Sequence, residues 1–192
     1  ANVSYEMNDK RIAYDICIAN QLLNYLSNKL GYDYDNNGNF ASQGSVNQDL
    51  FDKLNDNPYY RKSHPKSLGR EFFEEVQHKL VDDSKLDVKD LLRTATEHIA
   101  FQIAKSTEQL EKSKMLITGG GAKNTFLINR ICDLSKHEII IPDTTIIDYK
   151  EALIFAFLGV LKYERKTNVL SSVTGAASDS SSGKIYLPHN NK

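Results

Sequence analysis

The sequence has little cysteine, almost no net charge and no long hydrophobic run. Cys17 and Cys132 lie far apart, without CxxC or metal-ligand spacing, which indicates free thiols in a reducing cytoplasm. The net charge of -1 makes nucleic acid and anionic membranes poor partners. The longest apolar run, ALIFAFLGVL at 152–161, is about half of the ~20 residues that span a bilayer. We therefore expect this run to form a buried helix, and we expect a cytoplasmic protein without a secretory signal.

Several catalytic signatures are also missing from the sequence. The glycine triplet is followed by Ala122-Lys123-Asn124, so it matches neither GxGxxG nor a P-loop, and no GxSxG elbow is present. SDSSSGK at 178–184 lacks a preceding strand and is expected to be a surface loop. His98 lies off the apolar stripe of its helix and is expected to face solvent. No metal site is expected, because no HExxH or paired spacing occurs among His64, His78, His98, His137 and His189.

Hydrophobic patterning predicts helices that alternate with strands, which is typical of an α/β layer structure with parallel pairing in the second half. A Ser45-capped short helix is expected to reach about Leu54, and an Asp87-capped long helix to reach about Leu110. The tail, 171–192, is rich in Ser, Gly and Asn and is expected to be partly flexible. The remaining predicted elements are strands at 11–17, 114–118, 138–141 and 184–187, and helices at 18–30, from near 69, at 124–134 and at 149–165.

The most informative short stretch is the glycine triplet Gly119, Gly120 and Gly121, between a predicted strand and a predicted helix. Glycines give conformational freedom and clearance, and a helix N-terminus presents oriented N–H groups and a positive dipole end. Such a corner suits a phosphate or a nucleotide. A tight turn without any ligand is the alternative interpretation.

The order of several segments carries more information than any one of them. YDICIAN, PKSLGRE, GGGAKN, the KEAL and FAFLG helix and VTGA, spread over about 11–186, together resemble the C-terminal part of the anhydro-N-acetylmuramic acid kinase family. That family belongs to the sugar-kinase, hsp70 and actin superfamily. The resemblance implies a single C-terminal domain over 1–192, with an α/β, actin-like (ribonuclease H-like) fold and a mixed sheet flanked by helices. The helix at 152–161 is then expected to be central to the core.

The resemblance also implies a reaction. Family members use ATP and Mg²⁺ to open 1,6-anhydro-N-acetylmuramic acid hydrolytically and phosphorylate it to N-acetylmuramic acid 6-phosphate, in peptidoglycan recycling. Asp15 matches an aspartate of the family and would be the general base. A strand-end aspartate that caps the following helix is the alternative. Glu151 matches a glutamate beside the sugar and its attacking water, although an acidic residue near a helix start also favours the macrodipole.

The nucleotide side is implied by matches to other segments. Gly119, Gly120 and Gly121 match the family's adenosine-side loop, in which Asn124 would hold the turn or a polar group of the ligand. Asn20 matches the closing asparagine of the aspartate motif and would orient a phosphate or the nearby backbone. Lys66 and Ser67 match a family signature, with a substrate contact and a helix-entry turn as equal alternatives. The cleft is expected to be built from Asp15, the glycines and Glu151.

Two departures from the family pattern shape the functional expectation. YDICIAN stands where the family has a glycine-rich FDTGPGN-like motif, which argues against close phosphate contact at that turn. The family's GTMSGTSxDG-like signature is not found, so an N-terminal phosphate-binding domain is expected in cis or in trans. The isolated chain is then expected to be inactive and to bind nucleotide weakly. The alternatives are a non-catalytic nucleotide-binding or interaction module and a different sugar kinase of the superfamily. Homodimers are common in the family.

Overall fold

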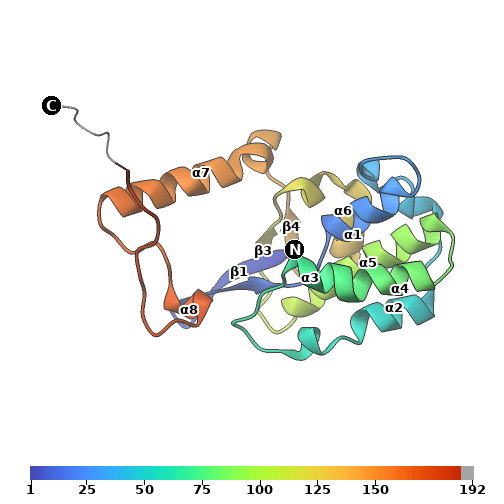
Figure 1. Ribbon diagram of the computed structural model, residues 1–192, viewed down its shortest axis with the longest axis horizontal. Coiled ribbons are helices and arrows are strands. Elements are labelled where there is room, and N and C mark those ends of the chain that lie inside the picture. Colours follow the sequence, from blue (N-terminus) through green and yellow to red (C-terminus); the bar gives the residue numbers. More distant parts are fainter. Residues whose placement is uncertain (187–192) are drawn as a thin grey trace.

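The structure is a computed structural model and describes residues 1–186. Figure 1 shows a helical body at one end, the strands in the middle and the helices α7 and α8 at the other end. The strands form two separate two-stranded sheets, β1 with β2 and β3 with β4. The described residues are thus α/β as expected, but their two small sheets replace the single mixed sheet that we predicted.

The chain begins with a hairpin of β1 (Asn2–Met7) and β2 (Lys10–Asp15). Asn8 and Asp9 connect the strands, and both adopt positive φ angles of 52° and 58°. Two-residue turns of this kind match the twist of paired strands, and Asn and Asp tolerate the left-handed region well. Sequence reasoning missed β1, although Val3 and Tyr5 alternate with polar residues ahead of this turn.

A helical body follows the hairpin. Asn47, not Ser45 as predicted, caps α2, because its side chain accepts a hydrogen bond from the Leu50 N–H at 3.0 Å. The body contains α1 (Asn20–Asn28), α2 (Gln48–Asn55), α3 (Arg70–Phe72), the π-helical turn η4 (Phe73–Gln77), α4 (His78–Asp83), α5 (Val88–Ser106) and the short 3₁₀ turns η1 (Asn36–Gly38), η2 (Ala41–Gln43) and η3 (Pro58–Arg61).

Helix α5 is the centre of the core and packs against α1, α2 and α6 (Thr125–Leu134). Asp87 caps it as predicted, accepting from the Lys89 N–H at 2.9 Å. Its predicted apolar stripe is confirmed, because Leu92, Ala95 and Ile99 are fully buried and Leu91 is nearly so. The burial of such side chains is the main driving force for folding of this body.

The prediction that His98 faces solvent is wrong. Its side chain is fully buried on α5, because α5 is covered on its polar side as well as along its apolar stripe. The ring lies in an uncharged hydrogen-bond network, with Nδ1 2.8 Å from Asn55 Oδ1 and Nε2 3.3 Å from the Tyr60 hydroxyl. Burial lowers the pKa of His98 to about 3.

The second sheet pairs β3 (Lys114–Leu116) with β4 (Glu138–Ile140) in parallel, as predicted for this half. One face of this pair packs on the core through Ile117 and Ile139. The other face is open, and Leu116 is exposed there. Both cysteines are free, as expected, with Cys17 buried and Cys132 exposed.

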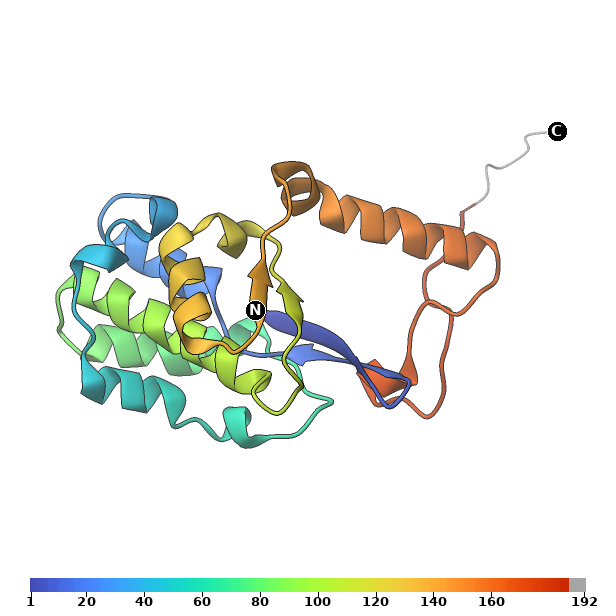
Figure 2. The same cartoon turned by 180° about the vertical axis from the view of Figure 1, so that it is seen from behind.

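The largest correction concerns α7 (Thr144–Tyr163), which begins earlier than the predicted start at 149 because Asp143 caps it. We expected its apolar run to be central to the core, yet none of its residues is buried. Figures 1 and 2 show α7 projecting from the strands, with its far end away from the helical body. No element of residues 1–186 covers its apolar face. Within the same residues, no helix combines the length and the hydropathy that a membrane crossing requires.

The chain then returns to the hairpin. Helix α8 (Ser171–Thr174) lies on β2, where the Ser172 hydroxyl donates to the Arg11 carbonyl at 2.7 Å. Val169 forms an isolated antiparallel bridge with Ser180. Residues 184–186 are not a strand, and Leu187, the last residue of the predicted strand, lies outside the described residues, as does the end of the predicted flexible tail.

Candidate functional site

The glycine triplet forms a sharp corner between β3 and α6. Gly119 adopts a φ of 80°, in the left-handed region that a side chain makes costly, and Gly120 begins the 3₁₀ turn η5 (Gly120–Lys123). A Cβ built on Gly120 would lie 3.1 Å from Asn20 Nδ2, and one on Gly121 would lie 3.5 Å from Asn20 Oδ1. The structure therefore brings together two predicted nucleotide-side features that are a hundred residues apart in sequence.

Asn20 lies at the N-terminus of α1, which faces this corner. The helix has Ala19 at its N-cap position, and no side chain caps it. The first N–H groups of a helix lack intrahelical partners and sit at the positive end of the helix dipole. Two sources of backbone N–H groups, the glycine corner and the uncapped start of α1, thus lie side by side, which is favourable for an anionic group.

Asn124 was predicted either to hold the turn or to bind a polar group of the ligand, and the structure shows the first of these roles. Its side chain accepts a hydrogen bond from the Leu127 N–H at 3.0 Å and so caps α6. A Cβ built on Gly38 would lie 2.5 Å from Asn124 Oδ1, which shows how closely the loop of residues 36–40 approaches the start of α6. Asn124 therefore holds the turn.

Asp15 ends β2 and is held by the PKSLGRE segment. Its carboxylate Oδ2 accepts from the Leu68 N–H at 2.9 Å, and its carbonyl accepts from the Tyr59 hydroxyl at 2.6 Å. Asp15 does not cap α1, so the alternative interpretation given for it is wrong. Its Oδ1 accepts no hydrogen bond from residues 1–186, which leaves one carboxylate oxygen available to a ligand or to water.

Lys66 stands beside Asp15 among aromatic rings. Its Nζ lies 4.7 Å from the Tyr59 ring centroid and 5.3 Å from that of Tyr14. Partial burial, and then the charge of Lys62, lower the pKa of the Lys66 ammonium. A Cβ on Gly175 would lie 2.9 Å from Pro65 Cγ, so the VTGA segment reaches the same place. Three segments of the resemblance therefore meet around Asp15.

Glu151 is placed differently from our expectation. It is exposed, and because α7 begins at Thr144 it lies beyond the first turn, so neither burial nor the helix dipole singles it out. Its neighbours do reach the glycine corner, because Lys150 Nζ donates to the Thr118 hydroxyl at 2.6 Å and Lys123 pairs with Asp148. The described residues form no hydrogen bond or ion pair that joins Glu151 to Asp15.

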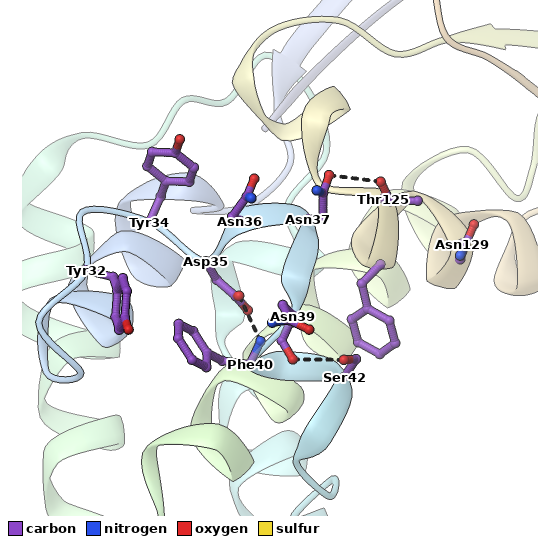
Figure 3. A pocket seen from close by; sticks show the side chains of 11 residues that line it. Tyr32, Tyr34, Asp35, Asn36, Asn37, Asn39, Phe40, Ser42, Thr125 and Asn129 are labelled. Carbon is purple, nitrogen blue, oxygen red and sulfur yellow. Dashed lines mark hydrogen bonds between the residues drawn. The ribbon is translucent and has the colours of Figure 1, made fainter.

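Sequence reasoning missed a hollow of about 650 Å³ beside the start of α6, shown in Figure 3. Asp35 lies in its wall and holds the loop that lines it, because its buried carboxylate accepts from the N–H groups of Phe40 and Ala41 at 2.8 and 2.9 Å. Aromatic faces and amide side chains line the hollow, a mixture that suits flat polar rings. The available signal was the aromatic and Asn residues interleaved in YDYDNNGNF. The lining residues are Tyr32, Tyr34, Asp35, Asn36, Asn37, Asn39, Phe40, Ser42, Thr125, Phe126 and Asn129.

The described residues suit one of the two expected cofactors, ATP, better than the other, Mg²⁺. The glycine corner and the uncapped start of α1 fit a phosphate-bearing ligand such as ATP. Within residues 1–186, no three His, Cys, Asp or Glu side chains converge to hold a metal ion. These residues offer no set of ligands that could hold a metal ion without help from a bound ligand.

Fold and site together define an α/β protein with a glycine corner next to the start of α1 and a hollow of about 650 Å³ next to the start of α6. A family model described as anhydro-N-acetylmuramic acid kinase matches residues 1–188. The chain belongs to the anhydro-N-acetylmuramic acid kinase family, which confirms the resemblance.

Curated relatives with that name support the assignment. One from Sulfurovum sp. (strain NBC37-1) is 32% identical over 180 residues, which cover 92% of this chain and 50% of the relative. One from Actinobacillus pleuropneumoniae serotype 7 is 34% identical over 184 residues, covering 91% and 50%. One from Mannheimia succiniciproducens is 31% identical over 202 residues, covering 97% and 54%. The chain spans about half the length of these curated relatives.

Proposed function

We propose that the chain is the C-terminal half of an ATP-dependent kinase that hydrolytically opens 1,6-anhydro-N-acetylmuramic acid and phosphorylates it to N-acetylmuramic acid 6-phosphate, in peptidoglycan recycling. The observation that carries the proposal is the contact of Asn20 with Gly120 and Gly121, in a family member whose next helix, α6, begins beside the hollow. In the proposal the backbone of the corner lies against the adenosine side of ATP, as the family resemblance implies for these glycines. Mg²⁺ would be held mainly by phosphate oxygens and water.

The proposed chemistry assigns a proton transfer to Asp15. A water molecule attacks the anhydro carbon, and the carboxylate takes a proton from that water. The anhydro C–O bond breaks, and the freed sugar oxygen attacks the γ-phosphorus of ATP and releases ADP. Asp15 is held by Leu68 and Tyr59 with Oδ1 left available, which is the arrangement a general base needs. Glu151 is proposed to lie by the sugar and its attacking water.

We propose that the other half of the kinase is a domain that binds the β- and γ-phosphates of ATP. The support is that the curated relatives are about twice as long as their match to this chain. The test is an assay of ATP-dependent phosphorylation of the anhydro sugar. One sample is this chain alone, and the other is this chain joined to the unmatched part of the Actinobacillus pleuropneumoniae relative. Turnover is expected only in the joined protein, and comparable turnover in both samples would contradict the need for a second half.

A non-catalytic module of the same fold is the second candidate. The observation that favours it is the burial of Ile16, Cys17 and Ile18, which fill the core where family members have a glycine-rich turn. A joined protein that binds ATP but phosphorylates no amino sugar would favour this candidate. Phosphorylation of another sugar in the same assay would favour a different sugar kinase of the superfamily.

Replacing Gly119 by alanine tests the nucleotide corner. The positive φ makes a Cβ unfavourable there, so we expect a loss of about 1 kcal/mol in unfolding free energy. We also expect about tenfold weaker ATP binding by calorimetry, because the corner must shift. Gly31→Ala is the matched control, since Gly31 also has a positive φ and open space around it but lies outside the corner. Equal losses of affinity in both variants would contradict the proposed corner.

A further inference from the structure

Helix α7 carries an apolar stripe along one face. Its spacings of three and four residues place five side chains on the same side of a helix with 3.6 residues per turn. Each of the five is between 40% and 67% exposed. We call this set the α7 stripe, and it consists of Ile146, Tyr149, Leu153, Phe157 and Val160.

The opposite face of α7 is different. Ile147, Leu158 and Leu161 are only partly exposed off the stripe, so the chain shields part of that side, whereas Phe155 on the same side is 71% exposed. The α7 stripe has no such cover from residues 1–186. The neighbouring parallel pair β3–β4 is also open on one face, where Leu116 is 59% exposed. Parallel strands are normally covered on both faces, so two independent features indicate a missing layer on this side of the molecule.

The size of the α7 stripe helps to identify its occupant. Five side chains of this kind at these exposures offer roughly 500 Å² of mostly apolar surface. Stable complexes between separate chains bury about 800 Å² on each partner, so the stripe by itself is too small for a self-standing homodimer, which would also have to cover Ile154, Phe155 and Tyr163. A domain in the same polypeptide needs less area, because linkage gives an effective concentration of the order of millimolar.

We propose that the α7 stripe is the docking surface for the other half of the kinase, the part that the curated relatives carry and that this chain does not match. The inference rests on the two-part kinase of the proposed function. In this arrangement, apolar residues of the other half pack against the stripe, and the same half covers the open face of β3–β4.

This arrangement also links docking to the glycine corner. Two interactions join the beginning of α7 to the corner. Lys150 donates a hydrogen bond to Thr118, and Asp148 forms an ion pair with Lys123. The stripe starts at Ile146 and runs away from these contacts along the same rigid helix. Docking of the second half on α7 therefore sets how that half is oriented toward the corner.

Hydrogen exchange of the α7 backbone tests the proposal. The samples are this chain alone and this chain joined to the unmatched part of the Actinobacillus pleuropneumoniae relative. We expect α7 amides to exchange at least about tenfold more slowly in the joined protein. Phe157→Lys, which puts a charge in the stripe, should remove this protection. Phe155→Lys is the matched control, because Phe155 is 71% exposed but points to the other side of α7.

Several results would overturn the proposal. One is equal α7 exchange in the two samples, and another is equal loss of protection in both lysine variants. Protection that rises with concentration in the chain alone, together with dimers in sedimentation, would assign the stripe to a second copy. Both lysine variants should melt like the parent in the chain alone, since neither side chain is buried. Exchange does not depend on turnover, so a protected α7 in a joined protein without kinase activity would contradict the proposed function and leave the docking surface standing.

Discussion

Asp15→Asn in the joined protein is expected to lower the turnover number for the anhydro sugar by about 10²- to 10⁴-fold, the usual contribution of a general base. Asparagine has nearly the same shape and keeps an oxygen that can accept from the Leu68 N–H. The backbone carbonyl of the residue can still accept from Tyr59. The substitution therefore removes the basic oxygen and preserves the local structure, so melting temperature and ATP affinity should stay close to those of the parent.

A comparison with Tyr59→Phe separates proton transfer from positioning. That variant keeps the carboxylate of Asp15 and removes only the hydroxyl that holds its carbonyl, so its turnover should fall less than tenfold. Steady-state rates with saturating ATP, measured for parent, Asp15→Asn and Tyr59→Phe, give the answer. Equal losses in the two variants would show that Asp15 acts by holding the loop, and an unaffected Asp15→Asn variant would remove it from the mechanism.

Local signals identified the elements whose determinants are near in sequence. Asp87 and the 3.6-residue stripe of α5 define a capped amphipathic helix, and the glycine triplet after an apolar run defines the corner. These predictions depend on neighbouring residues alone, and the structure confirms them. The signal for the hairpin strand β1 is equally local, because Asn8 and Asp9 tolerate the positive φ angles of a two-residue turn, and sequence reasoning missed it.

The contacts that build the candidate site depend on tertiary folding and could not be derived from spacing. Nothing near Asn20 in sequence indicates that its amide lies against Gly120 and Gly121. Likewise, the hydrogen bonds that Leu68 and Tyr59 donate to Asp15 join segments more than forty residues apart. The family resemblance supplied these residues, whereas the structure supplied which of them meet. Their chemical roles stay predictions until the variants above are measured.

Helix α7 shows how a pattern can be interpreted correctly and still mislead. Its apolar run does form a helix, but burial requires a neighbouring element, and residues 1–186 provide none for the α7 stripe. The same error placed Glu151 in a buried setting. A hydrophobic pattern predicts that a face will be covered, and it does not say which part of the complete protein covers it.

His98 gives the second large prediction, a loss of stability in mild acid. The ring is buried among uncharged partners, with Asn55 on Nδ1 and Tyr60 and Gln77 near Nε2. The folded pKa of about 3 lies below the ordinary histidine value of 6.5, because burial disfavours the charged ring. The unfolded chain therefore binds the proton more readily. Stability is fully present above pH 6.5 and declines as the pH falls from 6.5 toward 3.

The size of this loss follows from the two pKa values. Each pH unit below 6.5 costs about 1.4 kcal/mol, so urea unfolding at pH 4.5 should show about 2 to 3 kcal/mol less stability than at pH 7. His98→Gln cannot take up the proton, so its stability should be lower at pH 7 but flatter over this range. His64→Gln serves as the control, because His64 is partly exposed and forms no ion pair within residues 1–186, so its curve should parallel that of the parent. A His98→Gln curve as steep as the parent's would show that acid acts elsewhere in the fold. A flat curve would identify this single buried ring as the reason why the helical body opens in mild acid.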